Sequence, residues 1–200
     1  QRAASCRGAP HPRSHGIEGN LMTDLFTRAT SVRLVVLDVD GVLTDGSIWT
    51  GGNGELVKRF YTRDGLGIKM LQAAGIPVAI LTGRISAQTA SRAKELGITC
   101  VKQGKRFKTH AWEEILTEHG VTAEQTAYMG DDVPDIPILQ RAGLATVPAD
   151  ASEEILPLAH WVSPQNGGNG AVRSLAEFIL RSQGKWDRLI QKNYVEGDLS

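Results

Sequence analysis

Two aspartates stand one residue apart, directly after the apolar run Leu34–Leu37. They are Asp38 and Asp40. A carboxylate can attack phosphorus to form an aspartyl-phosphate, and a second carboxylate two residues on could protonate the leaving-group oxygen and later activate water. The pair is therefore compatible with phosphoryl transfer, with Asp38 as the nucleophile and Asp40 as the general acid and base.

A second group of carboxylates lies far along the chain, where Asp131 is followed by Asp132 and Asp135. If Asp131, with Asp132 or Asp135 behind it, shares a pocket with the first pair, several like charges crowd together. Such crowding is unfavourable unless a cation neutralises it. Every ligand on offer is an oxygen, with no Cys or His nearby, and hard oxygen ligands beside a phosphate favour Mg²⁺.

Polar residues between these two groups could hold a phosphoryl group. Thr82 follows the apolar run Pro77–Leu81, and a lysine follows the next predicted strand. Thr82 and this lysine, Lys108 or Lys105, could bind the phosphoryl oxygens and balance the charge that spreads over them.

The elements that would position these residues alternate between strands and helices. Strands are predicted over residues 34–37, 77–81, 98–102, 126–129, 145–147 and 161–162, and helices over 64–74, 86–96, 109–119, 136–141, 152–158 and 171–183. This alternation indicates an α/β fold with a doubly wound, Rossmann-like parallel sheet. Ligands bind such sheets at the carboxyl ends of the strands, where the polar residues described above are expected to meet.

A β-hairpin is predicted between the first strand and the first helix. Residues 47–50 and 55–61 are rich in β-prone types, and the Gly51–Gly54 segment between them tolerates positive φ. Because the hairpin emerges directly after Asp38 and Asp40, we expect it to stand over the site as a flap. No insertion is large enough to form a separate cap domain.

Composition excludes several classes of partner. The 200 residues include 22 basic and 22 acidic side chains, so neither nucleic acid nor a membrane surface is expected as the main partner. No apolar run approaches the roughly 18 residues that span a bilayer. Cys6 and Cys100 are far apart with no CxxC spacing, which argues against a disulfide framework or a zinc site and fits a cytoplasmic protein.

Three segments are expected along the chain. Residues 1–30 are predicted to be a disordered N-terminal extension and a lead-in of about one helical turn, in which Met22 could be the natural start. Residues 31–183 are predicted to form the catalytic domain, and residues 184–200 a C-terminal tail.

The chain resembles a capless member of the haloacid dehalogenase (HAD) superfamily of phosphotransferases. The segments DVDGVLTDG, LTGR, a downstream lysine and GDDVPD follow the order of the four motifs of that superfamily, and the match extends from about Val32 to Gln183. The hairpin, FYTRDG, QGKRFK and GGNGAVR narrow the resemblance to phosphatases that act on an eight-carbon sugar acid. It implies Mg²⁺-dependent hydrolysis through an aspartyl-phosphate.

The resemblance also implies a role for each site residue. Asp38 would be the nucleophile and a metal ligand, Asp40 the acid and base with its backbone carbonyl as a second ligand, and Asp131 the third ligand, supported by Asp132 and Asp135. Thr82 and Lys108 would bind the phosphoryl group, since Lys108 has the family's spacing after Gln103 and Gly104. Further substrate contacts are implied for Arg63, Asp64, Gly65, Lys69, Gly83, Arg84 and Arg92.

Assembly and substrate follow from the same resemblance. It implies a homotetramer in which flaps and C-terminal tails of neighbouring subunits replace a cap, and a product that feeds lipopolysaccharide synthesis in the cytoplasm. The family's tail pattern GGRGAVRE is altered here at Asn169 and Ser174, which weakens the expected tail contact. Two alternatives stay open: a phosphatase for a nine-carbon ketoacid phosphate or another small phosphomonoester, and a non-catalytic assembly module.

Overall fold

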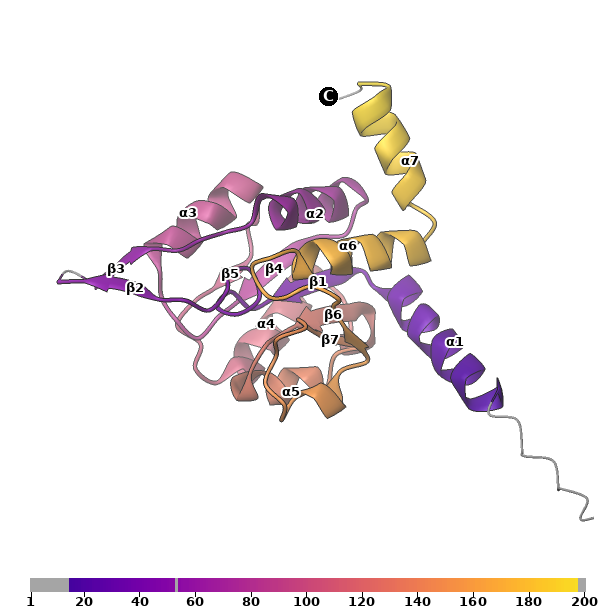
Figure 1. The fold of residues 1–200 in the computed structure, drawn as a ribbon, viewed down its shortest axis with the longest axis horizontal. Helices are drawn as coiled ribbons and strands as arrows, with labels where there is room; N and C mark the ends of the chain where they lie inside the picture. Colours follow the sequence, from indigo (N-terminus) through magenta and orange to yellow (C-terminus); the bar gives the residue numbers. More distant parts are fainter. Residues whose placement is uncertain (1–14, 53, 198–200) are drawn as a thin grey trace, which may run out of the picture.

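A six-stranded parallel sheet forms the centre of the computed structural model, which describes residues 15–52 and 54–197 (Figure 1). The strand order is β5-β4-β1-β6-β7-β8. The strands are β1 (Leu34–Leu37), β4 (Val78–Leu81), β5 (Val101–Lys102), β6 (Thr126–Met129), β7 (Leu144–Val147) and β8 (Trp161–Val162). The prediction of a doubly wound α/β fold is confirmed.

Strand β1 lies at the middle of the sheet, paired with β4 on one side and β6 on the other. All four of its side chains are buried: Val35 and Leu37 join the core on one face, and Leu34 and Val36 join the core on the other. The direction of winding reverses at β1. Its carboxyl end, where Asp38 begins, is therefore the position at which such sheets bind ligands.

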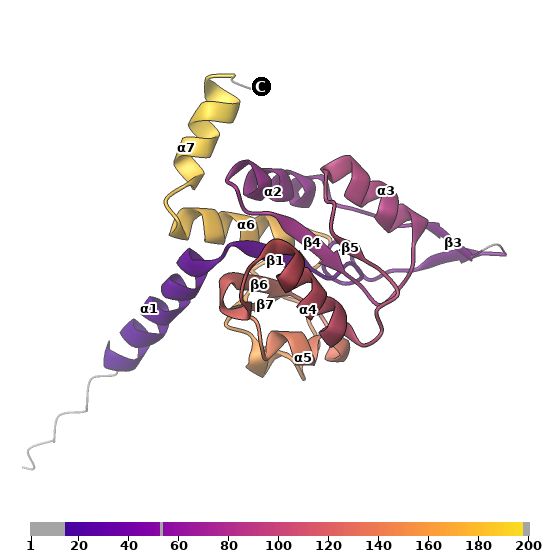
Figure 2. The ribbon, with the colours of Figure 1, turned by 180° about the vertical axis from the view of Figure 1, so that it is seen from behind.

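Helices cover both faces of the sheet. Helices α2 (Thr62–Ala73), α3 (Ala87–Leu96) and α6 (Ala171–Ser182) lie on one face, and α4 (Lys108–His119) and α5 (Ile136–Leu139) lie on the other (Figure 2). The ends of α3 follow from local chemistry, because the Ser86 hydroxyl accepts a hydrogen bond from the Thr89 N–H and Gly97 ends the helix at φ +70°. No described residue builds a separate cap domain.

The predicted hairpin is present as antiparallel β2 (Trp49–Gly51) and β3 (Gly54–Val57). It projects away from the sheet (Figure 1), and none of its described residues lines the cavity of its own chain. The expectation that the flap covers its own site is thus corrected. The reason is packing: Trp49 and Val57 are 64% and 56% exposed, so these two hairpin side chains are not packed against the described body of the chain.

Two helical predictions were too long. Of residues 152–158 only Leu156–Leu158 form a 3₁₀ turn, and α5 is four residues long. Pro157 lies in the interior of the predicted 152–158 helix and lacks the N–H that this helix needs, whereas α5 ends in a turn at residues 140–141.

The two ends of the described chain are more helical than the sequence indicated. Helix α1 (His15–Ser31) replaces the expected single turn, while residues 1–14 of the predicted extension lie outside the described residues. At the other end α7 (Trp186–Ile190) is followed by a π-helical turn, Gln191–Val195. Both α1 and α7 project from the end of the body opposite the hairpin (Figures 1 and 2). Every helix within residues 15–52 and 54–197 falls short of the length and apolarity that a membrane crossing requires.

Candidate active site

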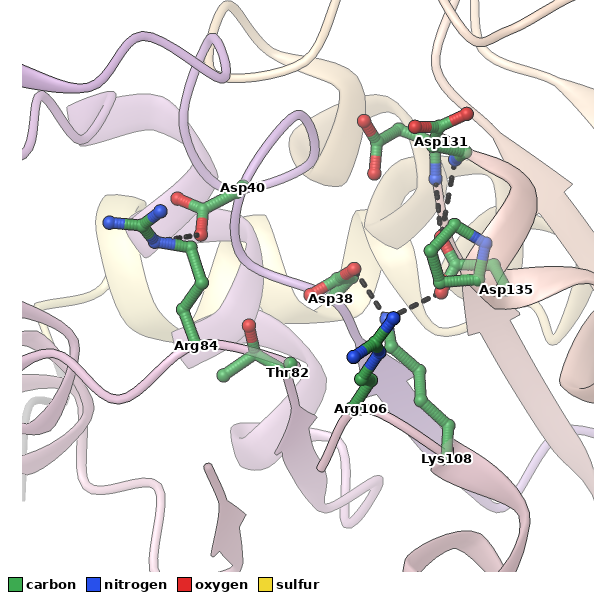
Figure 3. A pocket seen from close by; sticks show the side chains of 11 residues that line it. Asp38, Asp40, Thr82, Arg84, Arg106, Lys108, Asp131 and Asp135 are labelled. Atoms are coloured by element: carbon green, nitrogen blue, oxygen red, sulfur yellow. Dashed lines mark hydrogen bonds and ion pairs between the residues drawn. The ribbon is translucent and has the colours of Figure 1, made fainter. Parts of the chain in front are cut away.

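A cavity of about 330 Å³ opens at the carboxyl ends of β1, β4 and β6 (Figure 3). It is lined by residues that follow β1, β4 and β6 and by residues at the entry to α4. The structure thereby brings together nine of the residues that the sequence singled out: Asp38, Asp40, Thr82, Gly83, Arg84, Lys108, Asp131, Asp132 and Asp135.

Lys108 connects the two groups of aspartates. Its ammonium lies 2.5 Å from Asp38 Oδ2 and 2.5 Å from Asp135 Oδ1, and its side chain is 2% exposed. Burial opposes the charge, but the two carboxylates raise the pKa of Lys108 above its ordinary value. Burial raises the pKa of Asp38, and the neighbouring charge of Lys108 counteracts part of that rise.

Asp135 is the acceptor at the centre of this network. Its Oδ1 accepts from Lys108 and from the Tyr128 hydroxyl at 2.5 Å, and its Oδ2 accepts from the N–H groups of Asp131 and Asp132 at 2.9 and 3.3 Å. Burial raises the pKa of Tyr128 far above its ordinary value, so the hydroxyl keeps its proton and remains a donor. Both oxygens of Asp135 are therefore engaged within the protein.

Asp131 is in the opposite situation. Its carboxylate accepts no hydrogen bond and forms no ion pair with any residue in the described part of the chain, yet it is half-buried. Burial first, and then the charges of Asp38 and Asp135, raise the pKa of Asp131 to about 8. Two neighbouring carboxylates and partial burial disfavour a negative charge on Asp131, and a bound cation would offset both effects.

The donor set fits a divalent metal ion. Oxygens of Asp38, Asp131 and Asp135 all lie within 4.8 Å of one another, close enough to converge on one ion. Because Asp135 already accepts four hydrogen bonds, Asp38 and Asp131 have the freer lone pairs. The cavity lining carries five acidic and three basic side chains. When all of them are ionised, the lining has an excess of two negative charges, which one Mg²⁺ ion would neutralise.

Glycine allows the loop after β1 to meet Asp131. Gly41 has φ +79°, and a Cβ on it would lie 1.9 Å from Asp131 Oδ2. The far side of this loop is held by the segment before α6: the Gly168 N–H donates to the Val42 carbonyl at 2.9 Å, and a Cβ on Gly167 would lie 1.8 Å from the Gly41 carbonyl oxygen. A segment distant in sequence thus fixes the shape of the Asp38–Asp40 loop.

Asp40 is held by two cations. The ammonium of Lys58, which follows β3, forms an ion pair with Asp40 Oδ1, and the side chain of Lys58 is 2% exposed. Arg84 Nε lies 3.6 Å from Asp40 Oδ2 (Figure 3). Lys58 was not predicted as a site residue. The sequence gives no signal for this contact, because Lys58 meets Asp40 only once the end of the hairpin lies beside the loop after β1 in the folded chain.

The residues after β6 both cap a turn and contribute to the cavity. The Asp132 carboxylate accepts from the Val133 N–H at 2.8 Å and caps the 3₁₀ turn Val133–Asp135, while Asp132 also lines the cavity. Asp135 completes the capping box and holds Lys108.

Three of the predicted substrate-contacting residues are engaged by other parts of the same chain. Asp64 is 1% exposed, and its carboxylate accepts from the backbone N–H groups of Gly170 and Arg173 at the start of α6. Gly65 is also buried, and a Cβ on it would lie 2.4 Å from a guanidinium nitrogen of Arg92. Arg92 pairs with Glu95 at 2.7 Å and does not line the cavity. Within one chain Asp64, Gly65 and Arg92 do not line the cavity, and their contact with a substrate stays a prediction.

Arg63 and Lys69 lie on α2, are exposed and are also outside the cavity. Arg63 lines a second hollow of about 410 Å³, which lies between α2 and the start of α6. Asn169 and Ser174 also line this hollow. Neither side chain reaches Asp38 within one chain.

Two further residues of the site were missed besides Lys58. Tyr128 lies three positions before Asp131 in a buried strand, and a buried tyrosine needs a partner for its hydroxyl, which was an available signal. Arg106 lines the cavity two positions before Lys108. The sequence does not distinguish it from a solvated side chain, because Arg106 lies in a loop with several basic residues.

Comparison with known proteins agrees with this geometry. A family model for haloacid dehalogenase-like hydrolases matches residues 59–143. The 3-deoxy-D-manno-octulosonate 8-phosphate phosphatase KdsC of Escherichia coli K12 is 41% identical over 169 residues, which are 84% of this chain and 90% of that protein. A HAD superfamily (subfamily III A) hydrolase from Legionella pneumophila has a TM-score of 0.85 at 36% identity, covering 90% of this chain and 98% of that one.

A structure with ligands is also similar. The crystal structure of 3-deoxy-D-manno-octulosonate 8-phosphate phosphatase from Moraxella catarrhalis, in complex with a magnesium ion, a phosphate ion and a KDO molecule, has a TM-score of 0.82 at 38% identity. It covers 84% of this chain and 97% of that one. From the extent of these matches, the chain belongs to the 3-deoxy-D-manno-octulosonate 8-phosphate phosphatase family of haloacid dehalogenase-like hydrolases.

Proposed function

We propose that the protein hydrolyses 3-deoxy-D-manno-octulosonate 8-phosphate to the free sugar acid and phosphate, with Mg²⁺ as its cofactor. One observation supports this proposal above the others. Asp38 stands at the end of the central strand between the ammonium of Lys108, at 2.5 Å, and the carboxylate of Asp131, which has no partner among the described residues. A nucleophile, a cation for phosphoryl oxygens and a metal ligand are thus adjacent.

In the first step an oxygen of Asp38 forms a bond to phosphorus as the ester P–O bond breaks. Asp40 donates a proton to the departing sugar oxygen, and the product is an aspartyl-phosphate. Lys108 and the Thr82 hydroxyl, both buried, hold the phosphoryl oxygens where charge develops.

In the second step water attacks the phosphorus and the bond to Asp38 breaks. Asp40, now a carboxylate, takes the proton from the water and is ready for the next cycle. Asp38, Asp131 and the backbone carbonyl of Asp40 would hold Mg²⁺, and the bound ion would supply positive charge to neutralise the carboxylates and the phosphoryl group. Asp132 and Asp135 support this arrangement by ordering the turn after β6.

We also propose a homotetramer in which the hairpin packs against a neighbouring copy. Its exposed apolar side chains, among them Ile48, Trp49 and Val57, support this contact. In such an assembly Arg63 and Lys69 reach a substrate only from a neighbouring subunit. The product would feed lipopolysaccharide synthesis, and we place the reaction in the cytoplasm, which suits the buried thiol of Cys100.

The test is phosphate release from a panel of phosphate esters, with and without EDTA. We expect the eight-carbon sugar-acid ester to have the highest kcat/KM, EDTA to abolish the reaction, Mg²⁺ to restore it, and Asp38→Asn to remove it. Phosphate release by Asp38→Asn at the wild-type rate would refute the mechanism. A preference for a nine-carbon ester would replace the substrate, and no release from any ester would favour a non-catalytic assembly module.

A further inference from the structure

We propose that Arg106 determines substrate specificity by binding the carboxylate of the sugar acid. This inference rests on the proposed function and names the residue that recognises the leaving group. The observations that carry it are the position of Arg106 in the cavity lining, the anchoring of its loop, its exposure, and the engagement of the neighbouring cations.

The backbone directs Arg106 and Lys108 toward the same cavity. Phe107 between them is extended, with φ −103° and ψ 104°. In an extended segment alternate side chains point the same way, and the intervening one points the opposite way. Accordingly Arg106 and Lys108 both line the cavity, while Phe107 is 85% exposed and lines none of it.

The loop that carries Arg106 is fixed to the loop after β4. The N–H of Gly104 donates to the Arg84 carbonyl at 3.3 Å, and the N–H of Lys105 donates to the Thr82 carbonyl at 3.0 Å. The Gln103 side chain accepts from the Ser86 N–H at 2.8 Å. Arg106 is therefore presented by a braced loop, which lowers the entropy cost of using it in binding.

The other cations around the cavity already have anionic partners. Lys108 contacts Asp38 and Asp135, and Arg84 lies beside Asp40. Arg106 forms no ion pair with any described residue. Its guanidinium faces the cavity in front of Lys108 in the view of Figure 3 and is available to an anion that enters.

Depth separates the two anionic groups of the substrate. The residues that would hold the phosphoryl group are at the floor, since Asp38, Thr82 and Lys108 are 8%, 3% and 3% exposed. Arg106 is exposed at the rim, so it meets the part of the substrate that projects from the floor, which is the sugar acid. A planar guanidinium binds a carboxylate with two parallel hydrogen bonds, whereas a neutral sugar offers it only hydroxyls.

The test compares Arg106→Gln with Lys105→Gln, a matched change that removes a charge from the same loop outside the cavity. The substrates are 3-deoxy-D-manno-octulosonate 8-phosphate and the same ester with its carboxylate converted to a primary amide. For the acid we expect Arg106→Gln to raise KM about tenfold, equivalent to about 1.4 kcal/mol, with kcat unchanged. For the amide we expect no change in KM. Arg106→Lys should recover part of the loss, and Lys105→Gln should match the wild type on both substrates.

Two results would overturn the inference: an unchanged KM of Arg106→Gln for the acid, or an equal rise for acid and amide. The second would mean that Arg106 contacts the phosphoryl group that both esters share. Failure of the proposed function is distinguishable, because the wild-type protein would then release phosphate from neither ester.

Discussion

Replacing Tyr128 with phenylalanine removes one oxygen from the centre of the buried network and little else. The ring stays edge-on to Trp112, with centroids 5.8 Å apart, so the packing is retained. What is lost is the hydrogen bond donated to Asp135 at 2.5 Å and the acceptor that lies 3.2 Å from the ammonium of Lys108.

The size of the effect follows from those contacts. A hydrogen bond to a charged group contributes about 1.5–3 kcal/mol, so we expect Tyr128→Phe to lower the free energy of unfolding by about 2 kcal/mol. For a chain of this length that corresponds to a Tm lower by about 4–8 °C. Because Asp135 and Lys108 lose a restraint, kcat should fall about threefold to tenfold through poorer positioning of the ammonium.

The assay is thermal unfolding together with steady-state phosphate release. Tyr194→Phe is the control for stability, since Tyr194 is 49% exposed and makes no hydrogen bond to any residue in the described ranges. A Tyr128→Phe protein with wild-type Tm and wild-type kcat would show that the hydroxyl is not part of the working network.

Three more predictions concern the carboxylates and their partners. In EDTA, Tm should fall as the pH rises from about 4 to about 8. The reason is that the unfolded chain loses the Asp131 proton near the ordinary pKa of 3.8, whereas the folded protein holds it up to a pKa of about 8. Added Mg²⁺ should raise Tm most at the upper end of that pH range. Lys58→Met, which frees Asp40, should lower kcat about tenfold for a sugar phosphate and less for an aryl phosphate, whose better leaving group needs less general acid. Asp64→Asn should lower the free energy of unfolding by about 1–2 kcal/mol, measured by denaturant titration, because it replaces an acceptor for the N–H groups at the start of α6 with a donor.

Each of these has a result that would contradict it. A Tm in EDTA that does not change between pH 4 and 8, or a Mg²⁺ effect that is the same at both ends, would mean that Asp131 does not hold its proton in the folded protein. Equal losses of Lys58→Met on sugar and aryl phosphates would show that Lys58 does not act through Asp40. An unchanged denaturation midpoint for Asp64→Asn would mean that the Asp64 carboxylate does not stabilise the start of α6.

The strand ends are where the sequence was most informative. Strands β1 and β4 are uninterrupted apolar runs in the sequence, so the points at which Asp38 and Thr82 end them could be located to the residue, and Asp131 lies two residues after the end of β6. Parallel strands share one carboxyl edge, so the convergence of these residues followed from the fold class alone.

Residues on helices could not be placed by the same reasoning. Asp64 and Arg92 have types that suit a sugar acid, but whether a helical side chain faces a cavity or a neighbouring helix depends on how the helix is rotated, which no strand end determines. The direction of the hairpin could not be predicted from the sequence either, because the orientation of an isolated two-stranded hairpin depends on the surface that it packs against.

The order of the strands has an electrical consequence. The three basic residues of the cavity lining, Arg84, Arg106 and Lys108, come from the β4 and β5 side of β1, whereas the charged residues contributed by the β6 side are all aspartates. The pocket is thus polarised, with Asp38 on the boundary between its two halves. Such an asymmetric charge distribution favours an approach in which the anionic phosphate ester meets the basic half of the pocket, so the order of the strands contributes to how the substrate is oriented.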